Sequence, residues 1–416
     1  MQWKAAHINP IPKITHPTTE SDYRPISITS VLSRILERKV VRSFIYPSIL
    51  TPPTHLSFHD QFAFRPTGST TCALIYLLQV ITEMLRTNAY IRVICLDFSK
   101  AFDTVCHYSL AEKLSKLSIP DNIYNWVVNF LEGRAHTTHF GGSTSVMAEI
   151  NASIVQGSAL GPSSYAIVAS DLHPLHSGNR MTKFADDTYL ISPEKLAHTC
   201  QAEISHVEQW AECNNLKLNR KKTFEILFHS PRNAIPKSRL PTDIPGITRV
   251  LSLKCLGVTL SHNLVFTDHI TEVICACQQS LYALRLLRAY GLKNQDVVTV
   301  FRATTLAKLT YASPAWWGFT NSNDRARLES VLRKAIKAQF YMEELPTIAE
   351  LCDISDQRLF NSIISNKDHV LYKLLPAKVS HGKAMRKRTH DFTLPPKINK
   401  LNEANFLIRM LYKDIY

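Results

Sequence analysis

This sequence has no long hydrophobic run and no export signal. None of its 416 residues lies in a stretch that stays apolar for the about 20 residues that a membrane-spanning helix needs. The segment from Met1 to His7 also lacks the apolar core of a secretory signal. With 45% hydrophobic and 20% charged residues, the composition is close to that of an ordinary globular protein. We therefore expect a soluble, folded protein that is neither secreted nor embedded in a membrane.

The cysteines show no pattern of disulfide pairs or of metal ligands. They number nine, an odd count, and they are scattered; Cys95, for example, lies in an apolar run between Ile94 and Leu96. Buried, reduced cysteines of this kind are typical of intracellular proteins. Cys275 and Cys277 lack both the spacing and the second pair of a zinc site, so we interpret them as two thiols on one helix. We expect an intracellular protein, and the sequence leaves nucleus or cytoplasm open.

Acidic residues are scarce relative to basic ones. The chain has 48 lysines and arginines against 34 aspartates and glutamates, a formal net charge of +14. Such an excess favours a polyanionic partner, and nucleic acid is the first candidate. An anionic membrane surface is the alternative, but it calls for a basic amphipathic anchor, and none stands out in the sequence.

The first half of the chain predicts a mixture of helices and strands. Frequent prolines up to about residue 60 confine long helices to the part after Pro25. One helix is expected over 30–46, and a second over 71–85, which is largely apolar and has neither proline nor glycine. A buried strand is expected over 91–96. These elements predict a mixed α/β region.

The second half predicts a separate helical unit. Apolar residues recur at intervals of three and four over 270–287, followed by Gly291, and the same spacing returns over 328–336. We expect a helical unit over 263–345. Beyond it the sequence predicts irregular structure, with an exposed basic segment over 378–400.

Three aspartates stand where acids can bind metal ions. Asp97 ends the predicted strand 91–96, although a lone aspartate there is more often a helix cap or a turn residue. Asp186 and Asp187 lie between two apolar, strand-forming flanks, which predicts a hairpin with both carboxylates at its tip. Adjacent acids repel, and magnesium is a natural counterion for them. An ordinary Asp-rich turn is the alternative. With Asp97 beside the hairpin, the three acids would form a two-metal site for phosphoryl transfer.

Seven motifs occur in the order of one protein family, and together they carry a resemblance that each alone would not. They are Tyr23-Arg24-Pro25-Ile26-Ser27, Phe62-Ala63-Phe64-Arg65, Asp97-Phe98-Ser99-Lys100-Ala101-Phe102-Asp103, Gln156-Gly157-Ser158-Ala159-Leu160-Gly161-Pro162, Phe184-Ala185-Asp186-Asp187, Leu216-Lys217-Leu218-Asn219 with Lys222-Thr223, and Leu253-Lys254-Cys255-Leu256-Gly257. The chain resembles the reverse transcriptases of non-long-terminal-repeat retrotransposons, jockey-like elements in particular, over roughly residues 3–340.

The resemblance implies a nucleotide site around the acids. Phe98 and Phe102 would bind the incoming nucleotide, and the ring of Phe102 would collide with a ribose 2′-hydroxyl and so favour deoxynucleotides. Core packing is the alternative for Phe102. Gln156 and Gly157 would line the same nucleotide, where an amide can hydrogen-bond and a glycine lets the backbone come close. Arg65 would grip the triphosphate, unless it is a solvated loop arginine.

The resemblance assigns further residues to the reaction and to the primer. Lys222 would act as general acid at the leaving pyrophosphate, although a simple basic contact to nucleic acid is also open. Asp103 would support the site rather than bind metal. Leu256 and Gly257 match the primer grip, where a tight turn would position the primer end. On the helical unit, the candidates for duplex contacts are Arg285, Arg288 and Arg302.

The implied fold is α/β (α+β), a right-hand polymerase whose palm is an antiparallel sheet backed by helices. We expect fingers over 1–92, a palm over 93–262, a helical thumb over 263–345 and a basic C-terminal segment over 346–416, with the whole reverse transcriptase domain at about 10–262. The implied activity is RNA-directed DNA synthesis from dNTPs on an RNA template and DNA primer, with two Mg²⁺ ions, or Mn²⁺ in their place.

Three points set limits on the resemblance. Too little chain precedes the first motif for the endonuclease of complete elements, so we expect a fragment or a truncated copy. A catalytically inactive, nucleic-acid-binding remnant is therefore the alternative function, and a group II intron maturase or telomerase-like polymerase is a lesser one. Tyr165 and the two serines before it replace a more apolar stretch of relatives, which puts the local packing in doubt.

Overall fold

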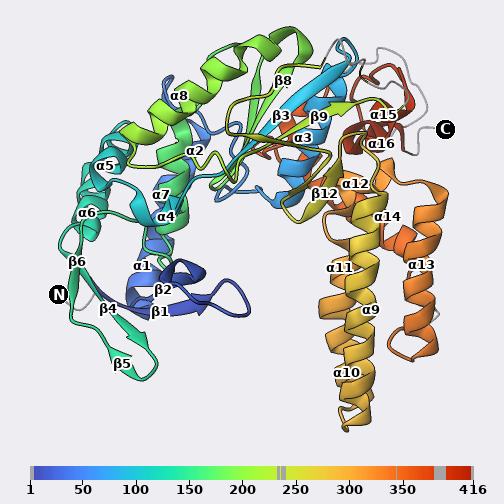
Figure 1. The fold of residues 1–416 in the computed structure, drawn as a ribbon, viewed down its shortest axis with the longest axis horizontal. Helices are drawn as coiled ribbons and strands as arrows, with labels where there is room; N and C mark the ends of the chain where they lie inside the picture. The colour runs from blue at the N-terminus through green and yellow to red at the C-terminus, as the bar shows by residue number, and fades with distance from the viewer. Residues whose placement is uncertain (1–3, 232–234, 236–239, 343, 379–389, 414–416) are drawn as a thin grey trace.

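A five-stranded sheet lies at the centre of the computed structural model, which describes residues 4–231, 235, 240–342, 344–378 and 390–413 (Figure 1). Its strand order is β10 (Thr248–Val250), β9 (Phe224–His229), β3 (Tyr90–Leu96), β8 (Asp187–Pro193) and β7 (Arg180–Phe184). All neighbours are antiparallel except β9 and β10. The predicted strand at 91–96 is confirmed as β3.

Alternation along β3 explains why helices cover both faces of this sheet. Ile91 and Val93 pack on one side with α3 (Thr70–Met84) and the C-terminal helices. Ile94 and Leu96 pack on the other side with α5 (His107–Ser115), α7 (Gly161–Val168) and α8 (Cys200–Cys213). A strand with apolar residues on both faces is buried on both faces. The expected α/β class, with an antiparallel sheet backed by helices, is confirmed.

A second sheet forms the N-terminal lobe. It joins β1 (Ala5–Pro12) and β2 (Tyr23–Ile28) to β4 (Arg134–Phe140), β5 (Ser143–Thr144) and β6 (Ala148–Ile150). The parallel pairing of β1 with β4 brings the segment 134–150, which the sequence assigns to the palm, into the same sheet as residues 5–28. Pairing across so long a crossover leaves no local pattern in the sequence.

Short helices complete this lobe. They are α1 (Val31–Val40), a π-helical turn (Val41–Ile45), α2 (Tyr46–Leu50), α4 (Ala101–Thr104) and α6 (Asp121–Leu131). The first three form the predicted helix 30–46 as one continuous helical segment. The helix predicted over 71–85 is α3.

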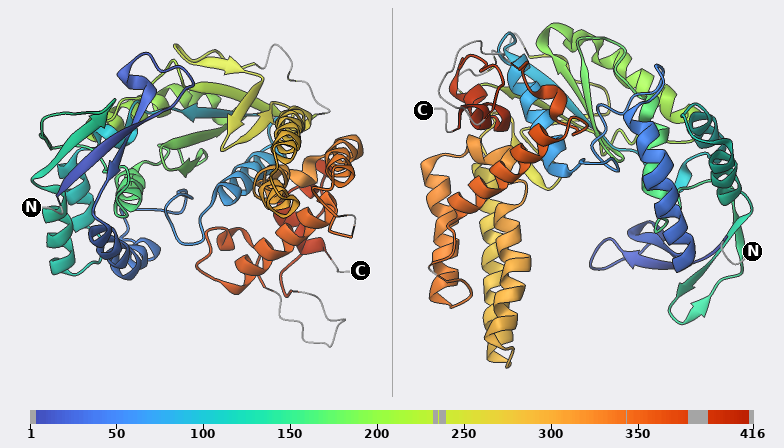
Figure 2. Two further views of the ribbon diagram at one scale, coloured as in Figure 1. Left: turned by 90° about the horizontal axis from the view of Figure 1, so that it is seen from below. Right: turned by 180° about the vertical axis from the view of Figure 1, so that it is seen from behind.

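The C-terminal lobe is helical. After the hairpin of β11 (Ser252–Cys255) and β12 (Val258–Ser261) come α9 (Thr267–Ala289), α10 (Asn294–Phe301), a π-helical turn (Arg302–Leu306), α11 (Ala307–Thr310), α12 (Ser313–Trp316), α13 (Ser322–Lys337), α14 (Ile348–Ser365), α15 (Lys400–Glu403) and α16 (Phe406–Tyr412). The helices predicted over 270–287 and 328–336 are confirmed as α9 and α13. Figures 1 and 2 show this lobe and the N-terminal lobe on either side of the central sheet.

The expectation of irregular structure beyond residue 345 is wrong. Residues 348–365 form α14, which begins with a capping box between Thr347 and Glu350. Its residues Ile348, Phe360 and Ile363 are buried in the same core as α3. Residues 379–389 of the predicted basic segment, which include Lys383, Arg386, Lys387 and Arg388, lie outside the described residues. Within the described part of the chain, no helix is long and apolar enough to cross a membrane.

Candidate active site

The acids at 186 and 187 lie on a tight hairpin, as the sequence predicts. Strands β7 and β8 pair as far as Phe184 and Asp187, so the turn consists of Ala185 and Asp186. Ala185 has φ 58, in the left-handed region, and its N–H donates to Oε1 of Gln61 at 3.1 Å. The side-chain amide of Gln61 thus supports an otherwise unfavourable turn conformation. The hairpin places both carboxylates at one end of the central sheet.

Asp97 lies at the same end of the sheet. The pairing of β3 with β8 ends at Leu96 and Thr188, so Asp97 and Asp187 are the next residues on two neighbouring strands. The backbone of Asp97 is fixed on its other side by two contacts. Its N–H donates to the Thr223 hydroxyl at 3.3 Å, and its carbonyl accepts from the N–H of Asn219 at 2.8 Å. The three acids of the predicted site are therefore brought together from separate parts of the chain.

The pKa values of the three carboxylates are all raised. Burial raises the pKa of Asp97, and the Lys222 ammonium opposes that rise. Burial also raises the pKa of Asp186, with a further rise from Asp97 and an opposing effect from Arg24. The pKa of Asp187 rises to about 6 because of burial and the charges of Asp186 and Asp97. A cation placed among these carboxylates would relieve their repulsion.

The donor set suits a hard divalent cation. All three ligands offer carboxylate oxygens, and magnesium is usually held by one or two carboxylates together with substrate phosphates. Among the described residues, no three His, Cys, Asp or Glu side chains are grouped closely enough to enclose a metal ion by themselves.

The segment at Gln156 and Gly157 is tied to the N-terminal sheet. The Ser27 N–H donates to the carbonyl of Gln156 at 2.7 Å. Gly157 has φ +124, and a Cβ there would lie 2.1 Å from the carbonyl oxygen of Ser27. Only glycine fits this position. The Gln156 amide donates to Oδ1 of Asp103 at 2.7 Å, so Asp103 holds the amide in place.

Phe102 lies near the acids and Phe98 is in the core. The Phe102 ring is half-buried and stacks on Tyr165 with centroids 4.7 Å apart. Burial raises the pKa of Tyr165, and the charges of Asp186 and Asp187 raise it further, so this pair adjoins the hairpin. The Phe98 side chain is 5% exposed and packs edge-to-face on Trp210, which leaves only its backbone for a nucleotide.

Two residues near the acids were not among the predicted site residues, and Tyr165 is the first of them. Its three-residue segment in α7 is fully buried, and the stacking on Phe102 accommodates the ring, so the polar departure from relatives does not disturb the packing. Arg24 is the second: its guanidinium lowers the pKa of Asp186 from the N-terminal sheet. The motif around Tyr23 contained it, but no local pattern indicated that β2 lies beside the hairpin.

The two predicted basic residues are placed differently. Lys222 lies near Asp97, whose pKa its charge lowers. The Arg65 guanidinium donates to the backbone carbonyls of Phe58 and Gln61, and it is engaged in bracing its own loop. Arg65 is therefore not in contact with the acids in this conformation, and a grip on triphosphate would require it to leave those carbonyls.

The turn at Leu256 and Gly257 is held by the C-terminal lobe. Both residues have positive φ, 47 and 84, in the two-residue hairpin between β11 and β12. The Tyr311 hydroxyl donates to the carbonyl of Leu256 at 3.0 Å and lies 2.9 Å from the Thr70 hydroxyl at the start of α3. The expected tight turn is present, and its position is set by residues from two other elements.

The candidate duplex contacts on the helical lobe separate into two groups. Arg285 and Arg302 have exposed side chains. Arg288 instead donates to the carbonyl of Ala338 at 2.6 Å and lies over the Phe340 ring at 4.9 Å, so it ties α9 to the end of α13. Arg285 and Arg302 remain the candidates for nucleic-acid contacts.

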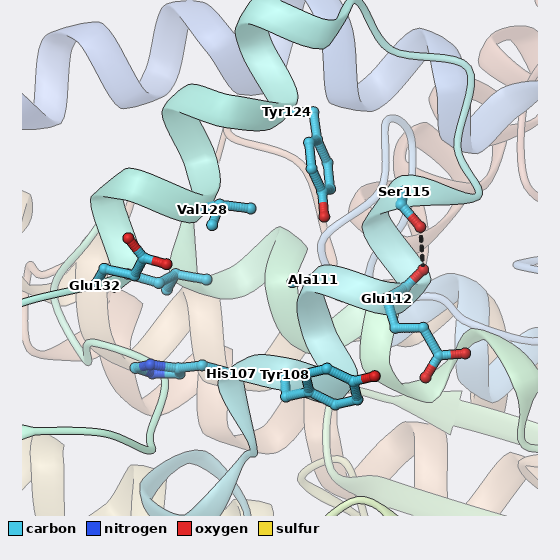
Figure 3. A pocket seen from close by; sticks show the side chains of 9 residues that line it. His107, Tyr108, Ala111, Glu112, Ser115, Tyr124, Val128 and Glu132 are labelled. Carbon is cyan, nitrogen blue, oxygen red and sulfur yellow. Dashed lines mark hydrogen bonds between the residues drawn. The ribbon is translucent and has the colours of Figure 1, made fainter.

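A cavity of about 510 Å³ between α5 and α6 lies apart from this site. Figure 3 shows its lining, which includes His107, Tyr108, Tyr124 and Glu132. None of the residues that the sequence predicts for the active site lines it. A larger cavity of about 710 Å³ lies against the N-terminal sheet, and Lys100 and Asp103 of the Asp97 motif line it. The second cavity, not the first, adjoins the candidate site.

An antiparallel sheet that presents three aspartates at one end, between a mixed N-terminal lobe and a helical C-terminal lobe, is the arrangement of the right-hand polymerases. Within that class the chain belongs to the reverse transcriptase (RNA-dependent DNA polymerase) family, whose sequence model matches residues 11–260. Polymerases of this family depend on divalent metal ions in general. The expected family is confirmed.

Retrotransposon polymerases are among the similar proteins. The chain is 31% identical over 389 residues to the RNA-directed DNA polymerase from mobile element jockey of Drosophila melanogaster, an alignment that covers 82% of this chain and 42% of the relative. It is 28% identical to the probable RNA-directed DNA polymerase from transposon BS of the same organism, covering 81% and 38%. The chain thus spans about two fifths of the length of these relatives.

Among solved structures, a telomerase shares the general arrangement at low sequence identity. Apo telomerase from Candida tropicalis is similar with a TM-score of 0.46 and 11% identity, over 81% of this chain and 59% of that one.

Proposed function

We propose that this chain is an active RNA-directed DNA polymerase that copies retrotransposon RNA into DNA. The observation that carries the proposal is the convergence of Asp97, Asp186 and Asp187 at one end of the central sheet. Burial raises the pKa of all three, and neighbouring acids raise those of Asp186 and Asp187 further. Such a cluster of like charges lowers stability unless a cation joins it, and it is therefore typical of a functional site.

We further propose that Asp97, Asp186 and Asp187 hold two Mg²⁺ ions, which Mn²⁺ could replace. When bound, the ions would activate the primer 3′-hydroxyl and neutralise charge on the phosphates during in-line transfer. The carboxylates orient the reacting groups, and their raised pKa values mean that a proton and a cation compete for the same oxygens. Lys222, beside Asp97, can deliver a proton to the leaving pyrophosphate.

The surrounding residues would select and position the dNTP. Phe102, held by its stacking on Tyr165, offers a rigid ring at the sugar. The Gln156 amide, held by Asp103, and the close backbone at Gly157 would line the nucleotide. The hairpin at Leu256 and Gly257 would hold the primer end.

The exposed helices of the C-terminal lobe would grip the RNA–DNA duplex. The template would be RNA and the primer DNA, and the net charge of +14 suits both. Under this proposal the protein works inside the cell, where its template is found. The alternative, a folded remnant that binds nucleic acid without catalysis, makes a different prediction for the same assay.

Primer extension tests the proposal. The protein is given oligo(dT)-primed poly(A) RNA, dTTP and Mg²⁺, and is compared with Asp186→Asn. Asp243→Asn is the matched control, because the Asp243 side chain is 80% exposed and pairs with Arg249, away from the three acids. We expect extension by the intact protein and by the control, and none by Asp186→Asn. Binding of the primed RNA without extension by the folded, intact protein would favour the remnant.

A further inference from the structure

The buried acid Glu37 makes contacts that link α1 to the segment 156–161, which we call the nucleotide segment because Gln156 and Gly157 are proposed to line the nucleotide. Its side chain is fully buried, at 0% exposure, on the inner face of α1. Oε2 accepts from the Ser158 hydroxyl at 2.5 Å, from the Ala159 N–H at 2.7 Å and from the Leu160 N–H at 3.1 Å. Oε1 accepts from the Ser33 hydroxyl at 2.8 Å. One carboxylate thus receives three hydrogen bonds from consecutive residues more than 120 positions away in the sequence.

These three donors belong to the chain directly after Gln156 and Gly157. They lead into α7, whose N-cap residue Leu160 makes no side-chain capping bond of its own. The first N–H groups of a helix have no partner within the helix, and a negative charge is favourable beside them. Glu37 therefore acts as a cap supplied from another element, together with the Ser158 hydroxyl, which accepts from the N–H groups of Leu160 and Gly161 at 3.1 and 3.2 Å.

The same segment is held on its other side by two further contacts. Ser27 of β2 donates to the Gln156 carbonyl, and Asp103 accepts from the Gln156 amide. Ser27 and Glu37 belong to consecutive elements, β2 and α1. The nucleotide segment is thus clamped at both ends by the N-terminal lobe. Without Glu37, one end of the clamp would be released.

We propose that Glu37 is a positioning residue for nucleotide binding, which holds the backbone of 158–160 so that Gln156 and Gly157 keep the place that receives the incoming nucleotide. This inference rests on the proposed polymerase function. Glu37 does not touch the substrate and acts only through the segment that it holds.

The hydrogen-bond pattern determines which substitutions should be tolerated. Glutamine can place its amide oxygen toward Ala159 and Leu160 while its NH₂ donates to Ser33, whose hydroxyl can also accept. Leucine has a similar volume but no acceptor, so the Ala159 N–H loses its partner and the Leu160 N–H keeps only the Ser158 hydroxyl. Glu37→Gln should therefore preserve the clamp, and Glu37→Leu should break it.

Glu203 provides a matched control. Its carboxylate is also buried at 0% exposure and accepts from the N–H groups of Leu175 and His176 at 2.9 and 3.0 Å, but these belong to a loop outside the nucleotide segment. Glu203→Leu should cost stability in the same way as Glu37→Leu without changing nucleotide binding.

The test measures KM for dTTP and kcat in primer extension, together with hydrogen exchange of the 156–161 amides. For Glu37→Leu we expect KM to rise about tenfold or more with kcat changed much less, and faster exchange at Ala159 and Leu160. Glu37→Gln should have a KM and amide exchange rates close to those of the intact protein. If Glu37→Leu does not fold, Ser158→Ala should raise KM in the same direction, because it removes one donor to Glu37 and an acceptor for the Leu160 and Gly161 N–H groups.

Two results would overturn the inference. One is an unchanged KM in folded Glu37→Leu, or in Ser158→Ala when the leucine variant does not fold. The other is an equal rise in KM for Glu203→Leu, which would mean that lost stability alone is responsible. Absence of extension by the intact protein would instead contradict the proposed function, and the hydrogen-exchange comparison would still report on the clamp.

Discussion

At the scale of single residues, the proposed chemistry depends on side chains whose properties follow from their immediate contacts. The ring of Phe102 is fixed by stacking on Tyr165, and the pKa of Asp187 is raised by burial and by two neighbouring acids. Both features can be tested by changes to one side chain.

Replacing Phe102 with valine should weaken discrimination against ribonucleotides. The smaller side chain leaves room for a 2′-hydroxyl where the ring would collide with it. We expect the ratio of kcat/KM for dTTP over UTP to fall by about tenfold or more, since steric exclusion is then lost. Incorporation assays with the two nucleotides measure the ratio. An unchanged ratio in an active variant would assign Phe102 to core packing alone.

The raised pKa of Asp187 predicts a dependence of stability on pH. Its folded-state pKa of about 6 lies above the ordinary value of 3.8, so the fold favours the protonated form. The associated stability is present below pH 3.8 and is lost as pH rises through about 6. Relative to Asp187→Asn, the intact protein should therefore lose stability between pH 4 and 7, as followed by Tm.

Magnesium should reverse that loss. Because the ion and the proton compete for the same carboxylates, added Mg²⁺ should raise Tm above about pH 7 and have little effect near pH 5. Asp187→Asn should show a smaller response. A Tm that rises equally with Mg²⁺ at both pH values would contradict this description of the site.

At the scale of elements, close contacts between separate segments position the site. The Gly157 substitution is the sharpest test of one such contact. Gly157→Ala places a Cβ 2.1 Å from the Ser27 carbonyl oxygen, in a conformation with φ +124. We expect a loss of about 2 kcal/mol or more in the free energy of unfolding, and weaker dTTP binding.

Gly142→Ala serves as the control for that experiment. Gly142 also has positive φ, +81, but a Cβ there meets nothing within 4 Å. Gly142→Ala should lower the free energy of unfolding by only about 1 kcal/mol, the cost of placing alanine at a positive φ. Equal effects of the two substitutions on stability and on nucleotide binding would mean that the contact with Ser27 is unimportant. Denaturant unfolding and dTTP titration measure the two quantities.

The hairpin at Leu256 and Gly257 offers a test of the primer grip. Tyr311→Phe removes a hydroxyl that joins the Leu256 carbonyl to Thr70. We expect primer–template to bind a few-fold more weakly, with stability changed by about 1 kcal/mol or less. Tyr290→Phe is the control, because Tyr290 is 88% exposed and should have no effect. Unchanged primer affinity in Tyr311→Phe would contradict a role of this hairpin in primer binding.

Elements that depend on local patterns were predictable from the sequence, and contacts across the chain were not. The helices α3 and α9 and the hairpin of β7 and β8 follow from apolar spacing and turn residues. The pairing of β1 with β4, the packing of Ser27 on Gly157 and the cap from Glu37 join residues more than 100 positions apart, for which no local pattern exists. The capping box of Thr347 and Glu350 is a local signal from which the start of α14 could have been predicted.

At the scale of the whole molecule, the central sheet and the two lobes each contribute a different part of the proposed site. The central sheet presents the acids, the N-terminal lobe holds the segment 156–161 that we propose lines the nucleotide, and the helical C-terminal lobe carries exposed arginines. Figure 2 shows the two lobes on either side of the sheet. Family membership could be predicted from ordered motifs, whereas the way in which the lobes meet the sheet could not.

The charge of the molecule predicts a strong dependence of nucleic-acid binding on salt. A net charge of +14 and exposed Arg285 and Arg302 favour contacts with phosphates. Each arginine changed to alanine should reduce the slope of log K against log[salt] by about 1 if it contacts one phosphate. Arg288→Ala should instead lower stability, because that guanidinium is bound to Ala338. Unchanged slopes for the first two variants would remove them from the duplex-binding surface.

The most direct test of the central claim, that the three acids form one catalytic site, is the single-turnover extension rate of Asp97→Asn, Asp186→Asn and the double variant. Residues that act as a unit show strongly non-additive losses. We expect each single variant to fall to background while it still binds primed RNA, and the double variant to be no worse. Extension at an appreciable rate by either single variant would contradict the claim.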